Sequence, residues 1–389
     1  MSRLLMIVPA PVNRLPDGRL RMDVKFVEGM RLHTALAQGP ITAVLWDHGQ
    51  AIPFGADYAP QDLGFEQVVL DPGVAVPAAL LAQHDTILAS ADMTETLDLV
   101  RGPLPVCYAV EYTIGTRLKI VALDRGLSVP RKVWSMIWNL RMEQRRRRAF
   151  RQASALQANG YPAYEAYRGL NANIMLYLDG RMRRDMMATA GEMAARNARL
   201  ASNGPLRIVH SGRLEPMKGA QDLLPVARRL AAAGVDFTLD VFGTGSLEAE
   251  LAAGAKELDG RLRLHGPVDF ETHLVPWMRR EADLFLSCHR QSDPSCTYLE
   301  SMGCGVPVIG YANAMWARMQ ADAGSGWVVP MADWRAMADR IAGLASDRTT
   351  IASAAEIALG FAEVHDFETE FTRRMEQSTT RPWEQRTQV

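Results

Sequence analysis

The sequence has few cysteines, no long apolar run and almost no net charge. Its four cysteines form no C-x-x-C pair and lack the Cys/His spacing of a zinc site, so we expect reduced thiols in a cytoplasmic protein. No apolar run reaches the roughly 18 residues needed to span a bilayer, so any membrane contact is expected to be peripheral. Lys+Arg 43 against Asp+Glu 44 gives a net charge of -1, which does not favour nucleic acid as a partner.

The sequence does have the composition of a globular protein, with 48% hydrophobic and 22% charged residues. Short apolar runs of strand length alternate with stretches that have helical spacing, which predicts an α/β protein with parallel sheets covered on both faces. In the first half these runs lie at 4–9, 41–46, 66–70, 86–90, 104–110 and 173–178, and the same pattern restarts at residue 206.

A polar, Met/Ala-rich segment at 180–204 ends in Ser-Asn-Gly-Pro and predicts the connection between two halves. We therefore expect two doubly wound Rossmann-like domains, 1–190 and 191–389, that face each other across a cleft. A predicted C-terminal helix at 366–376 is a candidate for packing back on the N-terminal domain.

The segment 211–219 (SGRLEPMKG) follows a predicted strand and opens a helix, where free N–H groups and the helix dipole favour an anion. Arg213 and Lys218 add two positive charges there, which suit a pyrophosphate. The alternative is that both side chains only solvate a surface loop. Downstream, Gly243 and Gly245 also end a strand and permit a close backbone approach to a ligand, although a tight turn explains them equally well.

A third signal is the segment 289–310 (HRQSDPSCTYLESMGCGVPVIG), in which Asp293 and Ser295 precede a predicted helix. Glu300 follows within its first two turns, where a carboxylate can hold a ribose diol. Thr297 and Glu300 also have the spacing of a capping box, so Glu300 has an alternative role in the helix start.

These three segments, in this order, resemble the GT-B glycosyltransferases of the large retaining family (group 1, family 4) typified by sucrose synthase and bacterial mannosyltransferases. The resemblance covers about residues 206–345. It implies a GT-B fold in which Arg213 and Lys218 bind the donor diphosphate, the Gly243–Gly245 turn lies against the nucleotide and Glu300 grips the ribose. Further donor contacts are expected at Gly212, Ser295, Cys296 and Thr297.

The sequence departs from the family pattern at three places. Family members usually carry Glu eight positions before the residue that matches Glu300; here that position is Ser292, with Asp293 next to it as a candidate sugar-contacting carboxylate. The usual glycine pair after the first strand is replaced by 9–13 (PAPVN). Where the family often has a histidine, this chain has Glu111, which either faces the acceptor or forms a structural pair with Arg117.

The resemblance implies transfer of a hexose with retention, from a nucleotide diphosphate sugar to a glycan or lipid-linked acceptor, in bacterial surface polysaccharide biosynthesis. No protein nucleophile, cofactor or metal is expected, because Arg213, Lys218 and a helix N-terminus neutralise the leaving diphosphate. Ser292 and the missing glycine pair keep open a catalytically weak GT-B-like binding partner in an assembly complex. An oxidoreductase is disfavoured because no G-x-G-x-x-G follows the first strand.

The stretch 131–151 is strongly basic and also contains Trp134, Ile137 and Trp138, with Glu143 as its one acid. A helix of this composition is expected to lie on an anionic membrane surface, which would place the protein at the inner face of the cell membrane. The alternative is a solvated face whose tryptophans pack in the core.

Overall fold

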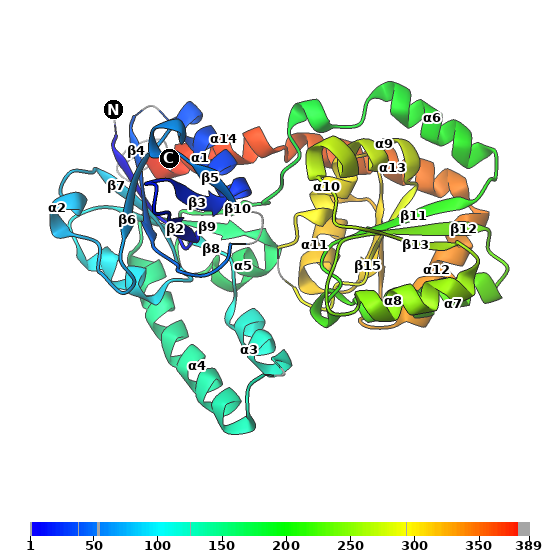
Figure 1. Cartoon of the computed structure of the whole chain (residues 1–389), viewed down its shortest axis with the longest axis horizontal. Coiled ribbons are helices and arrows are strands. Elements are labelled where there is room, and N and C mark those ends of the chain that lie inside the picture. The colour runs from blue at the N-terminus through cyan, green and yellow to red at the C-terminus, as the bar shows by residue number, and fades with distance from the viewer. Residues whose placement is uncertain (1, 38, 53–54, 125, 293, 380–389) are drawn as a thin grey trace. The chain divides into compact units, whose positions relative to one another are not determined.

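A computed structural model describes residues 2–37, 39–52, 55–124, 126–292 and 294–379. The chain forms two compact units, each built around its own parallel sheet (Figure 1). Among the described residues, the first unit contains those up to Tyr177 and those from Glu368 to Thr379, and the second contains those from Leu178 to Phe367. The chain therefore passes from one unit to the other twice, between Tyr177 and Leu178 and again between Phe367 and Glu368.

The first unit has a seven-stranded sheet whose strands all pair in parallel. Alternate residues of each strand point to opposite faces, and both faces are buried, which explains why the strands appear in the sequence as apolar runs. In spatial order the strands are β10 (Ile174–Tyr177), β9 (Ala155–Asn159), β8 (Val106–Val110), β7 (Thr86–Ser90), β1 (Leu4–Ile7), β4 (Ile41–Trp46) and β6 (Glu66–Leu70).

Helices cover the two faces of this sheet. Leu4 and Met6 of β1 pack in one core with α1 (Val24–Leu36) and α14 (Phe367–Thr379). Leu5 and Ile7 point the other way and share a core with the end of α4 (Val129–Gln152) and with α5 (Gly160–Tyr167). The other helical segments are α2 (Ala78–Leu81), α3 (Ile114–Leu123) and the short helices η1 (Pro60–Asp62) and η2 (Thr94–Arg101).

The segment after β1, where the family usually has a glycine pair, forms a small antiparallel sheet instead. It pairs β2 (Val12–Arg14) with β3 (Leu20–Asp23), and β3 with β5 (Gly55–Tyr58). Helix α1 begins only after β3, where the Asp23 carboxylate accepts a hydrogen bond from the N–H of Phe26. The segment that lacks the glycine pair therefore places two paired strands, β2 and β3, between β1 and α1.

The second unit has a six-stranded parallel sheet with the strand order 3-2-1-4-5-6 of the classic doubly wound fold. Because the first sheet also turns back beside its first strand, the prediction of two doubly wound Rossmann-like domains is confirmed. In spatial order the strands are β13 (Leu262–Gly266), β12 (Phe237–Phe242), β11 (Leu206–Ser211), β14 (Leu284–Ser287), β15 (Val308–Tyr311) and β16 (Trp327–Val329).

Helices surround this second sheet, and α7 and α12 pack on the same core face. The segment 180–204, predicted as a connection, contains a helix of this unit. The helices are α6 (Ala190–Ala201), α7 (Leu223–Ala232), α8 (Glu248–Ala255), α9 (Val275–Glu281), α10 (Thr297–Gly303), α11 (Ala314–Ala323), α12 (Trp334–Ser346) and α13 (Arg348–Val364), with short turns η3 (Arg184–Met186), η4 (Pro216–Lys218), η5 (Ala220–Asp222), η6 (Lys256–Leu258) and η7 (Phe270–Leu274).

Arg196 of α6 fixes this helix to the rest of the second unit. Its guanidinium is fully buried and donates to backbone carbonyl oxygens at the ends of α9 and α10. Helix C-termini leave carbonyl groups without partners inside the helix, so one cation here satisfies several of them. The acceptors are Met278, Arg279, Ala282, Cys304 and Gly305, at 2.5–3.4 Å.

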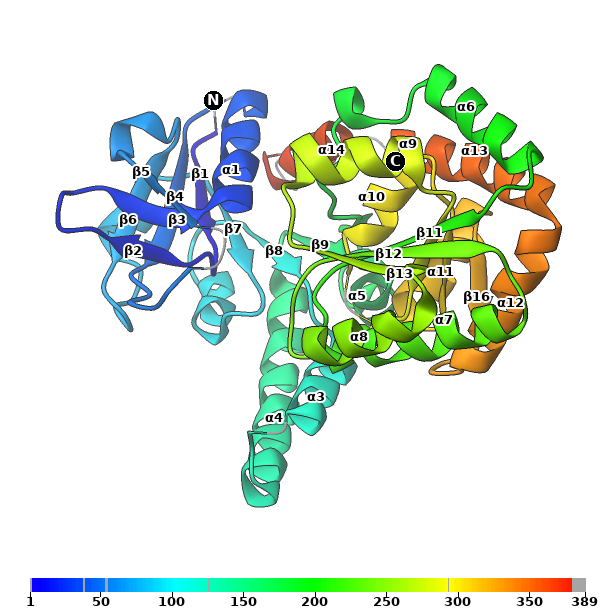
Figure 2. The ribbon, with the colours of Figure 1, turned by 45° about the vertical axis from the view of Figure 1, so that its right-hand side comes forward.

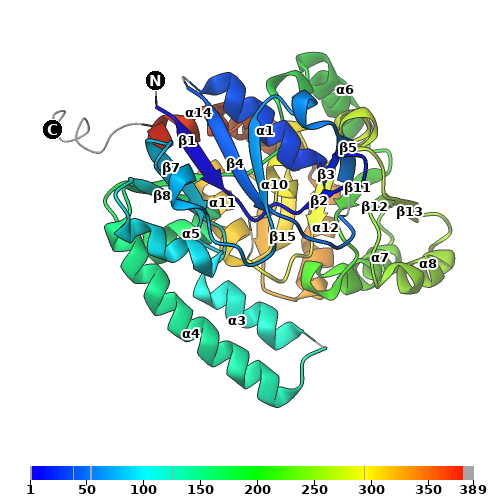
Figure 3. The ribbon, with the colours of Figure 1, turned by 60° about the vertical axis from the view of Figure 1, so that its left-hand side comes forward.

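Helices α3 and α4 lie side by side and project away from the sheet of the first unit, as Figures 2 and 3 show from two directions. We call this pair the helical hairpin. Within the described part of the chain, none of the helices combines the length and the apolar character needed to cross a membrane.

Candidate functional site

The predicted donor-binding segments of the second unit meet where its strand order reverses. Strands β11 and β14 are hydrogen-bonded neighbours. The strands that follow β11 in the chain, β12 and β13, lie on one side of this pair, and those that follow β14, β15 and β16, lie on the other. In doubly wound folds, ligands bind outside the carboxyl ends of the strands at this point. The loop after β11 contains Arg213 and Lys218, and the segment after β14 leads to α10. The two touch, since the N–H of Arg290 donates to the carbonyl of Met217 at 3.2 Å.

Gly219 fixes the position of Lys218 against β14. It has a φ of +72°, and a Cβ atom there would lie 1.8 Å from the carbonyl oxygen of Cys288. No other residue fits without movement of the backbone. Lys218 directly precedes this glycine at the end of the turn η4 and is buried, whereas Arg213 is exposed. A second brace comes from Asp222, whose buried carboxylate accepts from Arg290 at 2.7 Å.

Two buried histidines adjoin these cations, and the sequence analysis did not single them out. Burial, with a smaller effect of Lys218, lowers the pKa of His210 to about 4 against the opposing hydrogen bond with the carbonyl of Leu286. Burial also holds the pKa of His289 well below its usual value, and the charges of Lys218, His210 and Arg213 add to this effect. Since these charges act on one imidazole, His210, Arg213, Lys218 and His289 form one electropositive cluster whose histidines are neutral.

Polar atoms in this cluster lack partners. Among the described residues, neither ring nitrogen of His289 has a hydrogen-bond partner, and the same is true of Nε2 of His210. Buried polar atoms are nearly always hydrogen-bonded, so these nitrogens are candidates for contact with a ligand or with ordered water. The signal in the sequence was the position of each histidine: His210 is next to last in β11, and His289 follows β14 by two residues.

The glycine turn after β12 packs on the loop that contains Arg213. The N–H of Gly212 donates to the carbonyl of Phe242 at 3.0 Å, and the N–H of Leu214 donates to the carbonyl of Thr244 at 2.9 Å. A Cβ on Gly243 would lie 1.9 Å from the Gly212 oxygen, and one on Gly245 would lie 2.6 Å from the Leu214 oxygen. The two glycines therefore allow two loops of the protein to approach closely, and their contact with a nucleotide stays a prediction.

Glu300 lies buried in α10, and its carboxylate Oε1 accepts from Nε of Arg181 at 2.8 Å. The capping-box alternative is not observed, because α10 begins at Thr297 after Cys296 and has no side-chain cap. Arg181 lies with its guanidinium carbon 3.8 Å from the ring centre of Phe270. Although burial opposes it, the pair with Glu300 raises the pKa of Arg181. This ion pair fixes the position of the Glu300 carboxylate, whose oxygens can accept hydrogen bonds from a diol.

The residues before α10 are arranged as follows. The hydroxyl groups of Ser295 and Thr297 lie 2.9 Å apart, and the thiol of Cys296 donates to Asp179 at 3.7 Å. Oγ of Ser292, at the position where the family usually has glutamate, accepts the N–H of Ala314 at 3.0 Å. Asp293, the candidate replacement, lies outside the described residues, so its role stays a prediction.

In the first unit, Glu111 is exposed directly after β8. Arg117 forms an ion pair with Asp92, which follows β7 and which the sequence analysis missed. Burial raises the pKa of Asp92 even though Arg117 and Arg146 oppose this shift. Arg146 is itself buried and donates to the carbonyl of Ala91 at 3.1 Å. These charges lie where the first sheet reverses its strand order, between β1 and β7.

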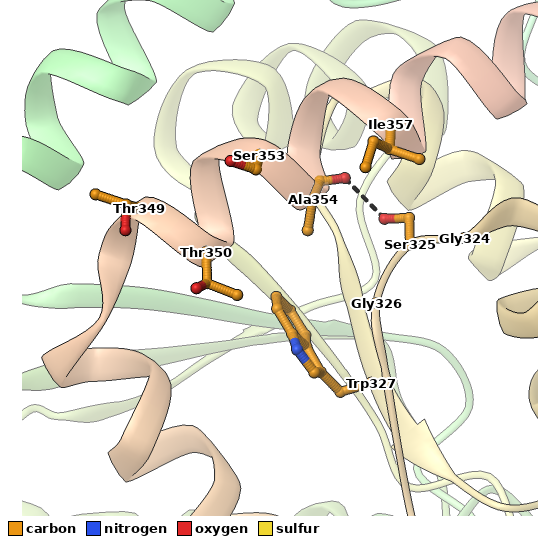
Figure 4. A pocket seen from close by; sticks show the side chains of 9 residues that line it. All are labelled: Gly324, Ser325, Gly326, Trp327, Thr349, Thr350, Ser353, Ala354 and Ile357. Atoms are coloured by element: carbon orange, nitrogen blue, oxygen red, sulfur yellow. Dashed lines mark hydrogen bonds between the residues drawn. The ribbon is translucent and has the colours of Figure 1, made fainter.

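Two further features of the second unit bear on ligands. Across the described ranges, no group of three or more His, Cys, Asp or Glu side chains is placed to hold a metal ion. A hollow of about 320 Å³ lies between the start of β16 and helix α13, lined by Trp327 and small polar side chains (Figure 4). None of the predicted donor-binding residues lines it.

The complete fold defines a class. The chain is similar to the crystal structure of the Anabaena protein HepE in complex with UDP, with a TM-score of 0.66, 16% sequence identity and coverage of 97% of this chain and 99% of that one. WaaG, a glycosyltransferase involved in lipopolysaccharide biosynthesis, gives a TM-score of 0.62 with 14% identity, 97% of this chain and 100% of that chain being covered. Such low identities show the fold alone, and the fold is GT-B, as predicted.

Sequence comparison relates the second unit to a particular family of enzymes. Residues 205–347 match the model of the family described as "Glycosyl transferases group 1". The putative colanic acid biosynthesis glycosyltransferase WcaL of Salmonella typhimurium is 28% identical over 150 residues, 36% of each chain. The phosphatidyl-myo-inositol mannosyltransferase of Mycolicibacterium smegmatis is 31% identical over 134 residues, 34% of each. These matches span about a third of each relative. Residues 205–347 are therefore similar in sequence to the group 1 glycosyltransferases, and the predicted resemblance is confirmed.

Proposed function

We propose that the protein is a retaining glycosyltransferase that moves a hexose from a nucleotide diphosphate sugar to a glycan or lipid-linked acceptor, in bacterial surface polysaccharide biosynthesis. The observation that carries this proposal is the electropositive cluster at the strand reversal of the second sheet, where Gly219 fixes Lys218 and Arg213 is open to solvent. The match to the family model supports it, as do relatives named as a putative colanic acid biosynthesis glycosyltransferase and as a phosphatidyl-myo-inositol mannosyltransferase.

In this proposal, Arg213 and Lys218 face the donor diphosphate and stabilise the negative charge that develops as it leaves. The two neutral histidines keep the site from an excess of positive charge and offer unpaired ring nitrogens to the ligand. Glu300, held by Arg181, accepts hydrogen bonds from the ribose. Transfer then depends on positioning and charge stabilisation, without a protein nucleophile, cofactor or metal.

The test replaces Arg213 and Lys218 by Ala, one at a time. Each change should lower kcat/KM for the donor roughly 30- to 1,000-fold, because it removes a charge aimed at the diphosphate. This factor corresponds to a loss of about 2 to 4 kcal/mol in transition-state stabilisation. Donors come from a thermal-shift screen of UDP-, GDP- and dTDP-sugars, since binding to the native state raises its apparent stability. The control is Arg228→Ala on α7, whose side chain is paired with Glu257 on the surface. Unchanged kinetics in both site variants would refute the proposal.

A second candidate function is a catalytically weak GT-B-like partner in a polysaccharide assembly complex. It is favoured by the hydroxyl of Ser292, which accepts a backbone N–H where the family usually supplies a carboxylate. Donor binding without transfer or hydrolysis by the purified chain would support this function over the first.

We also propose that the protein works at the inner face of the cell membrane, where a lipid-linked acceptor is anchored, and that it binds no nucleic acid. The stretch 131–151 has two parts. In the C-terminal part, Arg145 pairs with Asp98, Arg147 pairs with Glu143, and Arg146 is buried. In the N-terminal part, the alternative of tryptophans packed in the core is wrong, because Trp134 is 68% exposed and Trp138 is 39% exposed.

A further inference from the structure

The N-terminal half of α4 exposes most of its large apolar side chains. Six large apolar residues there are exposed, with Val129 the most exposed at 74%. On the opposite side of the helix, the amide of Asn139 is buried and donates to the carbonyl of Ser135 at 2.9 Å. We call the exposed set the tip surface: Val129, Val133, Trp134, Ile137, Trp138 and Leu140.

The spacing of these residues places them on one continuous side of the helix. Val129, Val133, Ile137 and Leu140 recur at intervals of three or four and form a stripe, and Trp134 and Trp138 form a second stripe beside it. Helix α3 covers the opposite side, where Nζ of Lys132 donates to the carbonyl of Ala122 at 2.9 Å. The exposed side is therefore not a remnant of the packing between the two helices. An apolar surface of this extent, rimmed by polar residues, marks an interaction site.

The charged residues of the helical hairpin indicate what kind of partner the tip surface binds. Residues 114–142 contain six bases, Arg117, Lys119, Arg125, Arg131, Lys132 and Arg141, and one acid, Asp124. Arg117 is paired with Asp92, which leaves five bases against that one acid. Arg131 and Arg141 are exposed on the same half of α4 as the tip surface. A second copy of this chain would bring like charges together, which is unfavourable. A bilayer with anionic headgroups offers the complementary charge, and tryptophan is enriched at the level of those headgroups.

We propose that the tip surface inserts among the headgroups of an anionic lipid bilayer and holds the first unit at the membrane. The inference deepens the proposed location and rests on it only for its biological purpose. The inserted tryptophans provide apolar anchoring, Arg131 and Arg141 provide the preference for anionic lipid, and the root of the hairpin is fixed to its own unit. That root is fixed by Arg146, which donates to Ala91, and by Arg145, which pairs with Asp98.

The test is sedimentation with vesicles of phosphatidylglycerol and phosphatidylcholine, compared with vesicles of phosphatidylcholine alone. The wild type should sediment with the first and not with the second, and its tryptophan fluorescence should shift to the blue. The double variant Trp134→Ser/Trp138→Ser should lose at least about tenfold in vesicle affinity. The matched control Ile357→Ser/Val364→Ser removes two exposed apolar side chains of α13 and should bind like the wild type.

Two further variants separate the contributions. Arg131→Gln/Arg141→Gln should weaken binding to anionic vesicles and reduce its dependence on salt, since exposed charges are screened over about 10 Å at 0.1 M salt. Arg145→Gln, at the root, should bind vesicles like the wild type. Equal sedimentation of the tryptophan double variant and the wild type would overturn the proposal. So would a change from dimer to monomer in that variant without any vesicle binding, because a second copy would then cover the tip surface.

Donor binding keeps this test distinct from the proposed function. The tryptophan double variant should retain the thermal shift given by the donor, because the tip surface and the electropositive cluster belong to different units. If the wild type bound vesicles but no nucleotide sugar, the proposed function would be refuted and the membrane-binding role of the tip surface would stand. If the wild type bound a nucleotide sugar but no vesicles, the membrane-binding role would be refuted and the proposed function would stand.

Discussion

Gly219 is the residue on which the position of Lys218 depends, so it connects backbone conformation to donor binding. Its φ of +72° disfavours any side chain, and a Cβ there would overlap the carbonyl oxygen of Cys288. The overlap is with backbone at the strand reversal, so relief requires the loop to move away from β14. Lys218 would move with it.

Gly219→Ala should therefore weaken donor binding and lower the free energy of unfolding. Gly234→Ala is the matched control, because Gly234 has nearly the same φ, +71°, and open space around it. The free energy of unfolding of the control should fall by about 1 kcal/mol from backbone strain alone, and that of Gly219→Ala should fall by about 2 kcal/mol more. Urea unfolding and titration with nucleotide diphosphate measure both effects. Equal losses in the two variants would show that the loop adapts without cost.

His210 makes stability depend on pH. Its pKa is about 4 in the folded protein against an ordinary value of 6.5, chiefly because of burial. Between these two values the unfolded chain binds a proton that the folded chain does not, so the free energy of unfolding should fall as the pH drops from 6.5 to 4. The contribution of this fully buried group is about 3 kcal/mol, and above pH 6.5 it should cause no change.

Urea unfolding at pH 7.5 and pH 5 tests this expectation. The variant His210→Gln should lose less stability than the wild type over this interval, because one group that must take up a proton on unfolding has been removed. His48→Gln replaces an exposed histidine of the other unit and serves as the control. The same pH dependence in all three proteins would contradict the assignment of this effect to His210.

At the scale of elements, the sequence predicted the strands that are mainly apolar. The runs at 41–46 and 86–90 coincide with β4 and β7, because strands buried on both faces carry mostly apolar side chains on both sides. Strand β9 was missed, since Gln157 and Asn159 interrupt its apolar character. The buried amide of Gln157 donates at 2.8 Å to the carbonyl of Arg374 and to the hydroxyl of Ser378, both more than 200 residues away in sequence. No local pattern contains that information.

The same limit applies to the site. Motif order placed Arg213, Lys218 and Glu300 in segments that the structure brings to the strand reversal of one sheet. Arg181, the partner of Glu300, comes from a segment 119 residues earlier and was not predicted. In α4, composition indicated a basic helix with exposed tryptophans, but not which arginines are free: Arg146 is buried because it reaches the carbonyl of Ala91, an acceptor that only the folded chain supplies.

At the scale of the molecule, the end of the chain completes the first unit. After the second unit ends, α14 packs against the first sheet and α1, where Phe371 lies 4.5 Å from the ring of His33, between ring centres. A Cβ on Gly29 would lie 3.4 Å from the Phe371 ring, so the helices are in close contact. The hydroxyl of Thr86 donates to the carbonyl of Ser378 at 3.3 Å. The first unit therefore cannot form its full core until α14 has been made.

This arrangement makes the stability of the first unit depend on residues that follow the second unit in the sequence. Phe371→Ala should cost about 3 kcal/mol, because the ring is 7% exposed and its removal leaves a cavity between α14 and α1. Phe361→Ala in α13 is the control, since it removes a half-buried ring from the second unit. Hydrogen exchange read at β9 and at β12 distinguishes the units: Phe371→Ala should reduce protection at β9 and spare β12. If β12 lost protection equally, the two units would unfold together, and α14 would stabilise the whole chain rather than the first unit alone.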